Sequence, residues 1–445
     1  MIKYLQRRIA GFLGGKAQEN YLSAYIIQNS IQLFLLQGFS LLLTFISNFV
    51  LIKVAGVTDY GWYVYIFNLV YLLVGFCVIG MDTLLVKRVA IYESADDNGK
   101  VKGVIFLAFG ICFAVSLLVT LVTAAIRSFR DLLPNNLDWS WFTLCLSTLL
   151  LLAVITLNQA ALQGLKKIAL SQIGEKLVRP VVLILSTLLL FFYKKRLDLE
   201  ELIWINVISL SITVIITSVL LQKNIKDKLK NVRAAYETKS WIPAALAFFI
   251  VGVLYLLNSR IDIFLLGLFR GHDEVAVYNV VLKVSEIVSF GLITVNYIMA
   301  PAIAKLFSNG DLSQLQQLIR RAAQVVLVIG LPLLLLIVIF RKTILVFVGV
   351  DFLNGEQALL ILCAGQLVNV LCGSVGTILI MSGYQRFSIY SLAISTCFGI
   401  ILNLLLTPRF GLVGTATATA SSIAVWNCLM YFFVSKKIKI RSTAF

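Results

Sequence analysis

The sequence predicts an all-α integral membrane protein with about twelve transmembrane helices. Of its 445 residues, 60% are hydrophobic and only 13% are charged, whereas soluble globular chains carry roughly a quarter charged residues. The polar residues collect in short clusters, and the stretches between them run for twenty or more residues with few charges. A helix needs about 20 apolar residues to cross the hydrocarbon layer, where its backbone groups must pair within the segment. These stretches lack the two-residue alternation of a membrane β-barrel.

Each of twelve apolar stretches is expected to form one membrane span. They cover roughly residues 26–52, 60–86, 104–126, 140–163, 172–193, 202–221, 241–268, 274–300, 318–340, 355–381, 387–407 and 411–434.

The basic residues predict the orientation. With the N-terminus placed in the cytoplasm, inside segments carry 26 lysines and arginines and outside segments 10, and only Arg260 and Lys283 remain within spans. This bias fits the positive-inside rule, so both termini are expected to be cytoplasmic. The net charge of +17 therefore indicates membrane orientation, and no nucleic-acid partner is expected.

The loops predict the organisation of the chain. Residues 1–24 resemble an interfacial amphipathic segment lying on the cytoplasmic surface. The longest inside loop, the basic segment 222–240, separates a six-helix bundle at 25–221 from another at 241–434, and a basic cytoplasmic tail follows at 435–445.

The two halves repeat short motifs. An Asp-Tyr-Gly-Trp-Tyr run at 59–63 follows the first span and Asp273 to Tyr278 follows the seventh, while Gly164 and Gly383 both mark a cytoplasmic turn. Six spans repeated in one orientation predict two bundles related by an axis along the membrane normal, as in alternating-access transporters.

Metal and disulfide chemistry are not expected. The seven cysteines lie in apolar stretches without paired spacing, and the single histidine, His272, lies in a loop. Neither a disulfide framework nor a histidine-rich metal site fits this pattern, and no cofactor is predicted.

Ionisable residues within spans are costly in lipid and are candidate functional groups. Arg260 and Asp262 lie in the seventh span, and Lys283 and Glu286 lie three residues apart in the eighth. Helical rise places all four near the membrane midplane. Two interpretations stay open: a central cavity that attracts an anionic substrate, or a neutral ion-pair network that locks the two helices together.

Other charges have simpler interpretations. Asp82, beside a basic pair, is expected near the inner end of the second span, and Glu175 is expected to pair with Arg179 four residues later on one helix.

A resemblance adds to these patterns. Short motifs recur in a fixed order over residues 25–434: Tyr60-Gly61-Trp62-Tyr63, Lys87-Arg88, Trp241, Pro243, the run RIDIFLLG from Arg260, Tyr278, Pro301, Pro332, Gly383, Asn403 to Pro408, Gly411 and Gly414. This order resembles the polysaccharide-transport branch of the MOP exporter superfamily, and the O-antigen and capsule repeat-unit flippases in particular.

The resemblance implies a MOP/MATE-like architecture with two six-helix bundles around a central cavity in the cytoplasmic membrane. It implies that a lipid partner, an undecaprenyl-pyrophosphate-linked oligosaccharide, is moved to the outer leaflet by alternating access, often with ion coupling. A polysaccharide polymerase and a chain-length regulator are the implied protein partners.

The resemblance also suggests site residues. Those expected to bind the substrate are Arg260, Lys283, Asn258 and Arg179; those expected to couple ions are Asp262, Glu286 and Asp82. Twelve spans instead of fourteen separate the chain from the lipid II flippases. The first half is expected to contribute mostly uncharged polar groups such as Asn48, Asn68 and Asn158.

Two rival functions remain. A multidrug antiporter of the same superfamily shares the architecture but prefers an acidic cavity. A membrane enzyme of polysaccharide synthesis commonly needs an intramembrane histidine or a large outside loop, which this sequence lacks.

Overall fold

The computed structural model describes residues 20–125, 139–230 and 232–443, and within those ranges every regular element is a helix. The first half contains α2 (Asn20–Ala55), α3 (Val57–Val78), α4 (Met81–Ser94), α5 (Asn98–Ala125), α7 (Trp139–Gly164), α8 (Ile168–Ile173), the π-helical η1 (Gly174–Val178), α9 (Arg179–Tyr193) and α10 (Leu199–Leu229). The second contains α11 (Thr238–Phe269), α12 (His272–Glu286), the 3₁₀ turn η2 (Ile287–Ser289), α13 (Phe290–Ser308), α14 (Leu312–Ile339), α15 (Arg341–Val348), the 3₁₀ segment η3 (Val350–Gly355), α16 (Glu356–Cys372), α17 (Val375–Met381) and α18 (Gln385–Ile438).

The prediction of an all-α membrane protein is confirmed. Among the described residues, 11 helical segments are long and apolar enough to cross a membrane. The last of them, α18, has 54 residues and is interrupted at Gly411, whose φ of 54° is not helical. The two parts lie antiparallel, since Ser422 donates to the carbonyl of Ser395 over 2.9 Å. They correspond to the two predicted spans 387–407 and 411–434.

Two predicted spans are broken where the sequence predicts one helix. The span predicted at 60–86 ends with α3, because Ile79 and Gly80 both adopt left-handed conformations, with φ of 45° and 69°. The span predicted at 355–381 breaks at Gly373, where φ is 70°. Hydropathy detects neither break, because the flanking residues stay apolar.

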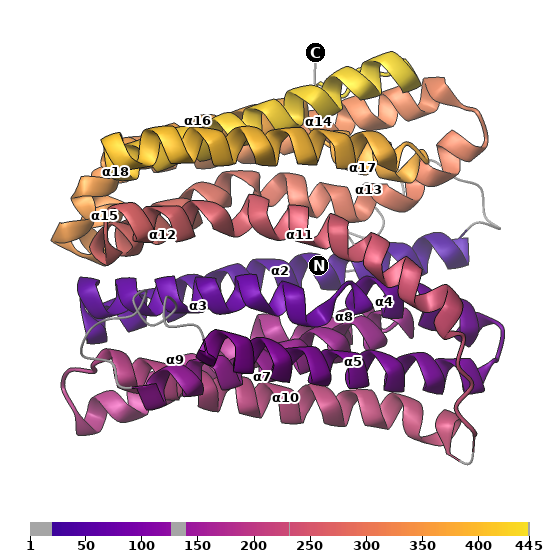
Figure 1. The fold of residues 1–445 in the computed structure, drawn as a ribbon. Helices are drawn as coiled ribbons and strands as arrows, with labels where there is room; N and C mark the ends of the chain where they lie inside the picture. Colours follow the sequence, from indigo (N-terminus) through magenta and orange to yellow (C-terminus); the bar gives the residue numbers. More distant parts are fainter. Residues whose placement is uncertain (1–19, 126–138, 231, 444–445) are drawn as a thin grey trace.

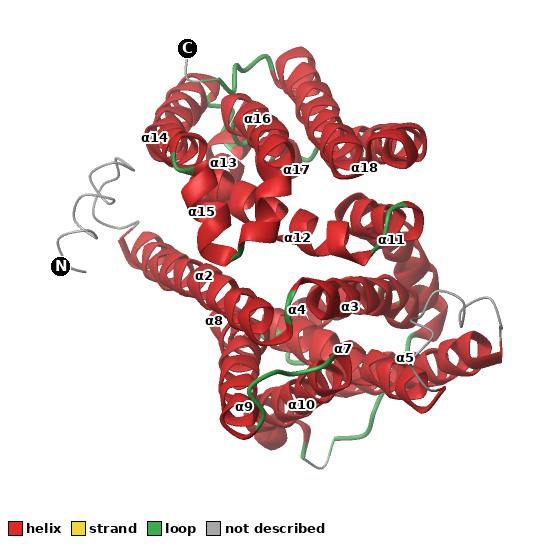
Figure 2. Ribbon diagram, turned by 90° about the vertical axis from the view of Figure 1, so that its left-hand side faces the viewer, coloured by secondary structure: helices red, strands yellow, loops and turns green. Residues whose placement is uncertain are grey.

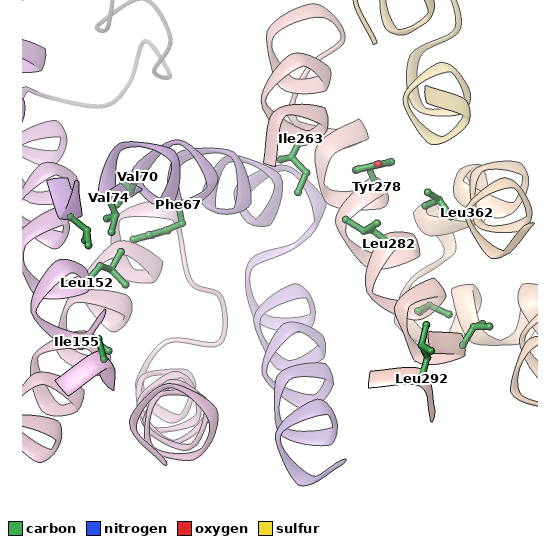
Figure 3. Close-up of a cluster of buried hydrophobic side chains, with 14 of the residues drawn as sticks. Phe67, Val70, Val74, Leu152, Ile155, Ile263, Tyr278, Leu282, Leu292 and Leu362 are labelled. Atoms are coloured by element: carbon green, nitrogen blue, oxygen red, sulfur yellow. The ribbon is translucent and has the colours of Figure 1, made fainter. Parts of the chain in front are cut away.

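The buried apolar side chains of the two halves form one continuous core. In Figure 1 the elements from α2 to α10 lie below those from α12 to α18, and α11 crosses diagonally between the two groups. Figure 3 shows Phe67 and Val70 of α3 facing Leu152 of α7, whereas Leu282 of α12 faces Leu362 of α16. All of these side chains are buried.

Many large apolar side chains lie on the outside of the molecule. Phe192 is 85% exposed and Val328 is 73% exposed. On a soluble protein such a surface would be an aggregation liability, whereas lipid is its natural solvent. The amphipathic segment predicted at 1–24 lies mostly outside the described residues.

Contacts between the halves run along α3, α11 and α12. Viewed after a 90° turn, α3 lies beside α11 and α12 at the boundary between the halves, and α2 lies beside α15. The candidate site is located along this boundary.

Candidate functional site

A cleft lies between the halves, with α2 on one wall and α12 and α13 on the other. Its volume is about 220 Å³. The polar residues that line it are Gln37, Ser40, Thr44, Asn48, Tyr60, Lys176, Asn279, Lys283 and Glu286, and the remaining lining is apolar.

Two consecutive hydrogen bonds link three residues that line the cleft. The Tyr60 hydroxyl donates to Oδ1 of Asn48 over 2.7 Å, and Nδ2 of Asn279 donates to the same hydroxyl over 2.7 Å. Asn48 and Tyr60 belong to the first half and Asn279 to the second, so neutral polar groups join the halves at this level.

Each wall contributes one lysine. From the second half, Lys283 forms an ion pair of 2.8 Å with Glu286 one turn later on α12, and its side chain is 40% exposed. From the first half, Lys176 donates to Oε1 of Gln37 over 2.6 Å and has no carboxylate partner among the described residues. Lys176 therefore places a positive charge on the cleft wall without a direct ion pair to a described carboxylate.

Arg179 and Arg260 come together at a second place. The guanidinium carbon of Arg179 lies 5.4 Å from the centre of the Tyr71 ring, and that of Arg260 lies 4.7 Å from the same centre. Arg179 also donates to the Tyr71 hydroxyl. The prediction that Glu175 pairs with Arg179 is wrong. The segment between them, η1, is π-helical, and the Arg179 side chain instead contacts Tyr71 of α3.

The structure gives the contacts of the midplane charges. Lys283 pairs within its own helix, and the Arg260 guanidinium forms no ion pair with any described carboxylate. Among the described residues, no ion pair within 4.0 Å therefore links the seventh span to the eighth.

Asp262 lies apart from the cleft, inside the second half. It is 5% exposed, and it accepts hydrogen bonds from the Tyr278 hydroxyl at 2.7 Å, the Thr419 hydroxyl at 3.2 Å and the Ile263 amide at 2.8 Å. A cavity of about 30 Å³ beside it is lined by Asn258, Ile261, Thr396, Gly399, Asn403, Thr419, Ser422 and Ile423. That volume has room for a water or a small cation.

The predicted site residues therefore fall in four places. Lys283 and Glu286 line the cleft, Arg179 and Arg260 flank Tyr71, and Asn258 and Asp262 line the internal cavity. Asp82 lies in the first turn of α4, just after the break at Gly80, and lines neither space.

The polar groups of the first half also divide. Asn48 lines the cleft, and Asn68 donates to the Arg260 carbonyl over 3.0 Å. Asn158 instead donates to Thr217 and Ser218, which are on α10 of its own half.

Sequence reasoning missed several residues of the cleft and its surroundings. Lys176 is one of the 26 basic residues that the predicted orientation assigns to inside segments, although the predicted span 172–193 includes it. Tyr71 and Asn279 carried no signal beyond being polar groups in apolar stretches. Tyr60 belongs to a repeated motif, but the motif does not give the direction in which its side chain points.

Two family models match the chain. The model described as polysaccharide biosynthesis protein matches residues 26–307, which is more than half of the chain. The chain belongs to this family. A second model, MatE, matches residues 243–405 of this polysaccharide biosynthesis family member.

Curated relatives of this family member are archaeal. It is 24% identical over 217 residues to the probable low-salt glycan biosynthesis flippase Agl15 of Haloferax volcanii, over 48% of this chain and 45% of the relative. It is 27% identical over 187 residues to the uncharacterized membrane protein MJ1068 of Methanocaldococcus jannaschii, over 41% of this chain and 37% of the relative. The chain thus aligns with less than half the length of either relative.

Solved structures share the fold. An inward-facing multidrug resistance MATE family transporter of the MOP superfamily matches with a TM-score of 0.71 and 12% identity, over 90% of this chain and 94% of that one. The lipid II flippase MurJ in an inward closed conformation matches with a TM-score of 0.68 and 14% identity, over 91% and 87%. The polysaccharide biosynthesis family member is therefore a multi-pass membrane protein with the fold of the MOP superfamily.

Proposed function

We propose that the protein is a flippase that moves an undecaprenyl-pyrophosphate-linked oligosaccharide across the cytoplasmic membrane by alternating access. The product would serve O-antigen or capsule synthesis, where a polymerase and a chain-length regulator would receive it. The protein acts as a transporter and catalyses no bond-breaking reaction in this proposal.

The observation that carries the proposal is the cleft with one lysine on each wall. Lys176 comes from the first half and Lys283 from the second, and asparagines and a glutamine lie between them. Ammonium groups attract a pyrophosphate, while amide side chains form hydrogen bonds with sugar hydroxyls. A substrate that contacts both walls would also couple its binding to the relative position of the halves.

The family and the relatives support this proposal. The matching family model is described as a polysaccharide biosynthesis protein, and one relative is named as a probable glycan biosynthesis flippase. We propose that the cleft binds the sugar part of the substrate mainly by hydrogen bonds.

Ion coupling is proposed to use Asp262. Its carboxylate is buried beside a small polar cavity whose other oxygens come from hydroxyl and amide groups. Hard oxygen ligands suit a proton or a sodium ion. Exchange of that ion would change the packing of α11 against α12 and α18, where Tyr278 and Thr419 hold the carboxylate.

A multidrug antiporter is the second candidate function. The match of the MatE family model to residues 243–405 favours it. Cationic drugs, however, need an acidic cleft, and here the lysines outnumber the single carboxylate, Glu286.

Complementation of a gene deletion tests the proposal. The deletion strain would receive the wild type, Lys176→Ala, Lys283→Ala, the double variant, or Lys195→Ala as a control at an exposed loop lysine. Loss of a charge-assisted contact costs about 1.5–3 kcal/mol, so each cleft variant should reduce surface polysaccharide about tenfold or more. Gels follow the polysaccharide, and immunoblots show that each variant is present in membranes.

The deletion strain should also store lipid-linked repeat units on the inner leaflet. Unchanged polysaccharide with increased drug sensitivity would instead support the antiporter. Equal amounts of surface polysaccharide with the double variant and the wild type would contradict substrate binding by the two cleft lysines.

A further inference from the structure

Tyr71 lies between two arginines that come from opposite halves. Arg179 is on α9 of the first half, Arg260 is on α11 of the second half, and Tyr71 is on α3. The guanidinium carbons lie 5.4 and 4.7 Å from one ring centre, so they are at most about 10 Å apart.

Two like charges at this separation repel each other in a membrane, where little water screens them. Arginine does not release its proton under these conditions. The aromatic face attracts each guanidinium by a cation–π interaction, so the ring stabilises an arrangement that the two charges alone would oppose.

Neither arginine forms a direct ion pair with a carboxylate among the described residues, and Nε of Arg179 is buried without a hydrogen-bond partner. The polar contact of the Arg179 side chain is with the Tyr71 hydroxyl, a neutral oxygen. Buried guanidinium donors without an anion are costly, and phosphate oxygens satisfy them well.

We propose that Tyr71 is a positioning residue for a diphosphate group. Its ring contacts both Arg179 and Arg260, and its hydroxyl occupies the position on Arg179 that a phosphate oxygen takes when the ligand binds. The diphosphate then bridges an arginine of each half. The assignment of this anion to a lipid-linked glycan rests on the proposed function.

A purely structural role makes a different prediction. If Tyr71 only packed α3 against α9 and α11, removal of its hydroxyl would weaken the protein and would not strengthen anion binding. Tyr71→Phe keeps the ring and removes only the hydroxyl, so this variant separates the two roles.

Binding to the purified full-length protein in detergent provides the test. The probes are inorganic pyrophosphate, undecaprenyl pyrophosphate, and undecaprenol, which lacks phosphate. The variants are Tyr71→Phe, Tyr71→Ala, Arg179→Gln and Arg260→Gln. Tyr390→Phe serves as the matched control at an exposed tyrosine of α18.

Tyr71→Phe should bind the diphosphate probes more tightly, by up to about tenfold, because a competing charge-assisted hydrogen bond is gone. Tyr71→Ala and each arginine variant should bind about tenfold more weakly, and undecaprenol should show no difference among variants. Selective binding of undecaprenyl pyrophosphate identifies a lipid headgroup as the ligand, and equal binding of inorganic pyrophosphate identifies a soluble diphosphate.

Weaker binding by Tyr71→Phe, or unchanged binding by both arginine variants, would overturn the inference. If Tyr71→Ala does not fold, the binding measurements on the Phe and Gln variants still test the inference. If the binding pattern holds while the wild type fails to restore surface polysaccharide, the proposed function fails and the diphosphate site remains. If polysaccharide is restored without this binding pattern, only the role of Tyr71 fails.

Discussion

At the residue scale, the partner of each intramembrane charge determines its role. Lys283 has an acid beside it, Arg260 has an aromatic face, and Asp262 has two hydroxyls and an amide. A buried charge needs such partners because its desolvation is costly. The three residues therefore lie in three different environments.

Asp262→Asn should abolish ion-driven transport while leaving the fold intact. The amide is close in size to the carboxylate, and the hydroxyls of Tyr278 and Thr419 can rotate to serve it. In proteoliposomes, stimulation of lipid-linked glycan flux by an imposed proton or sodium gradient should fall about tenfold or more. This estimate corresponds to the loss of about 1.4 kcal/mol or more of coupling free energy.

Asp82→Asn is the matched control for Asp262→Asn, since Asp82 lines neither the cleft nor the internal cavity. Its gradient-driven flux should equal that of the wild type. Loss of coupling in Asp82→Asn alone would move the proposed ion site to α4.

At the scale of elements, the linker fastens the start of α11 to the first half. The hydroxyl of Tyr92, on α4, accepts from Nε1 of Trp241 and donates to Oε2 of Glu237, both over 2.9 Å. Glu237 also forms an ion pair of 2.8 Å with Lys100 of α5. Trp241 is fully buried, so α11 belongs to the second half along the chain but begins in contact with the first.

This linker cluster should lose its ion pair in acid. The hydrogen bond from Lys100, followed by that from Tyr92, holds the pKa of the Glu237 carboxyl below its ordinary value of 4.5. A lowered folded-state pKa means that the stabilisation is complete above about pH 4.5 and is lost as the pH falls through the lower value. The melting temperature of the wild type should therefore decline more steeply than that of Glu237→Gln below this pH.

Thermal scans of the purified protein between pH 7 and pH 4 would measure the difference. Glu200→Gln, at an exposed acid of α10 far along the chain from the linker, is the control. Parallel curves for the wild type and Glu237→Gln would show that the linker cluster contributes nothing to stability.

At the scale of the whole molecule, the halves meet closely at one end. The rings of Trp62 and His272 stack with centres 3.3 Å apart, and a side chain at Gly61 would overlap the His272 carbonyl. By the predicted orientation this is the outer end. The cleft of about 220 Å³ is smaller than the roughly 300–1,000 Å³ of pockets for drug-sized ligands. Under the proposed function, passage of an oligosaccharide would therefore require the halves to separate.

Gly61→Ala should weaken the outer closure, because even one methyl group displaces the His272 backbone. In a protein that also carries Asn279→Cys in the cleft, an impermeant maleimide added outside should label this cysteine several-fold faster than in the parent with Gly61. Gly252→Ala, at a glycine with open space around it, should leave the labelling rate unchanged. Equal rates for Gly61→Ala and the parent would contradict closure by this contact.

The sequence was sufficient to predict most of the membrane-spanning helices, because hydropathy depends only on which residues follow one another along the chain. The apolar stretches predicted the helices, and the two parts of α18, which meet at the non-helical Gly411, were divided correctly. The breaks at Gly80 and Gly373 were missed because a glycine in an apolar stretch is equally compatible with a straight helix. Lys176 was missed because its place near the predicted span boundary made it resemble a loop residue.

By itself, the sequence determined the membrane class, the spans and the presence of costly charges near the midplane. Each of these properties follows from the free energy of placing a residue in lipid. Only the tertiary structure decided that Lys176 and Lys283 line the same cleft, that Arg179 and Arg260 both contact Tyr71, and that Asp262 lines a separate cavity. Hydropathy leaves the rotation and tilt of a helix undetermined, because these are set by packing against neighbouring helices.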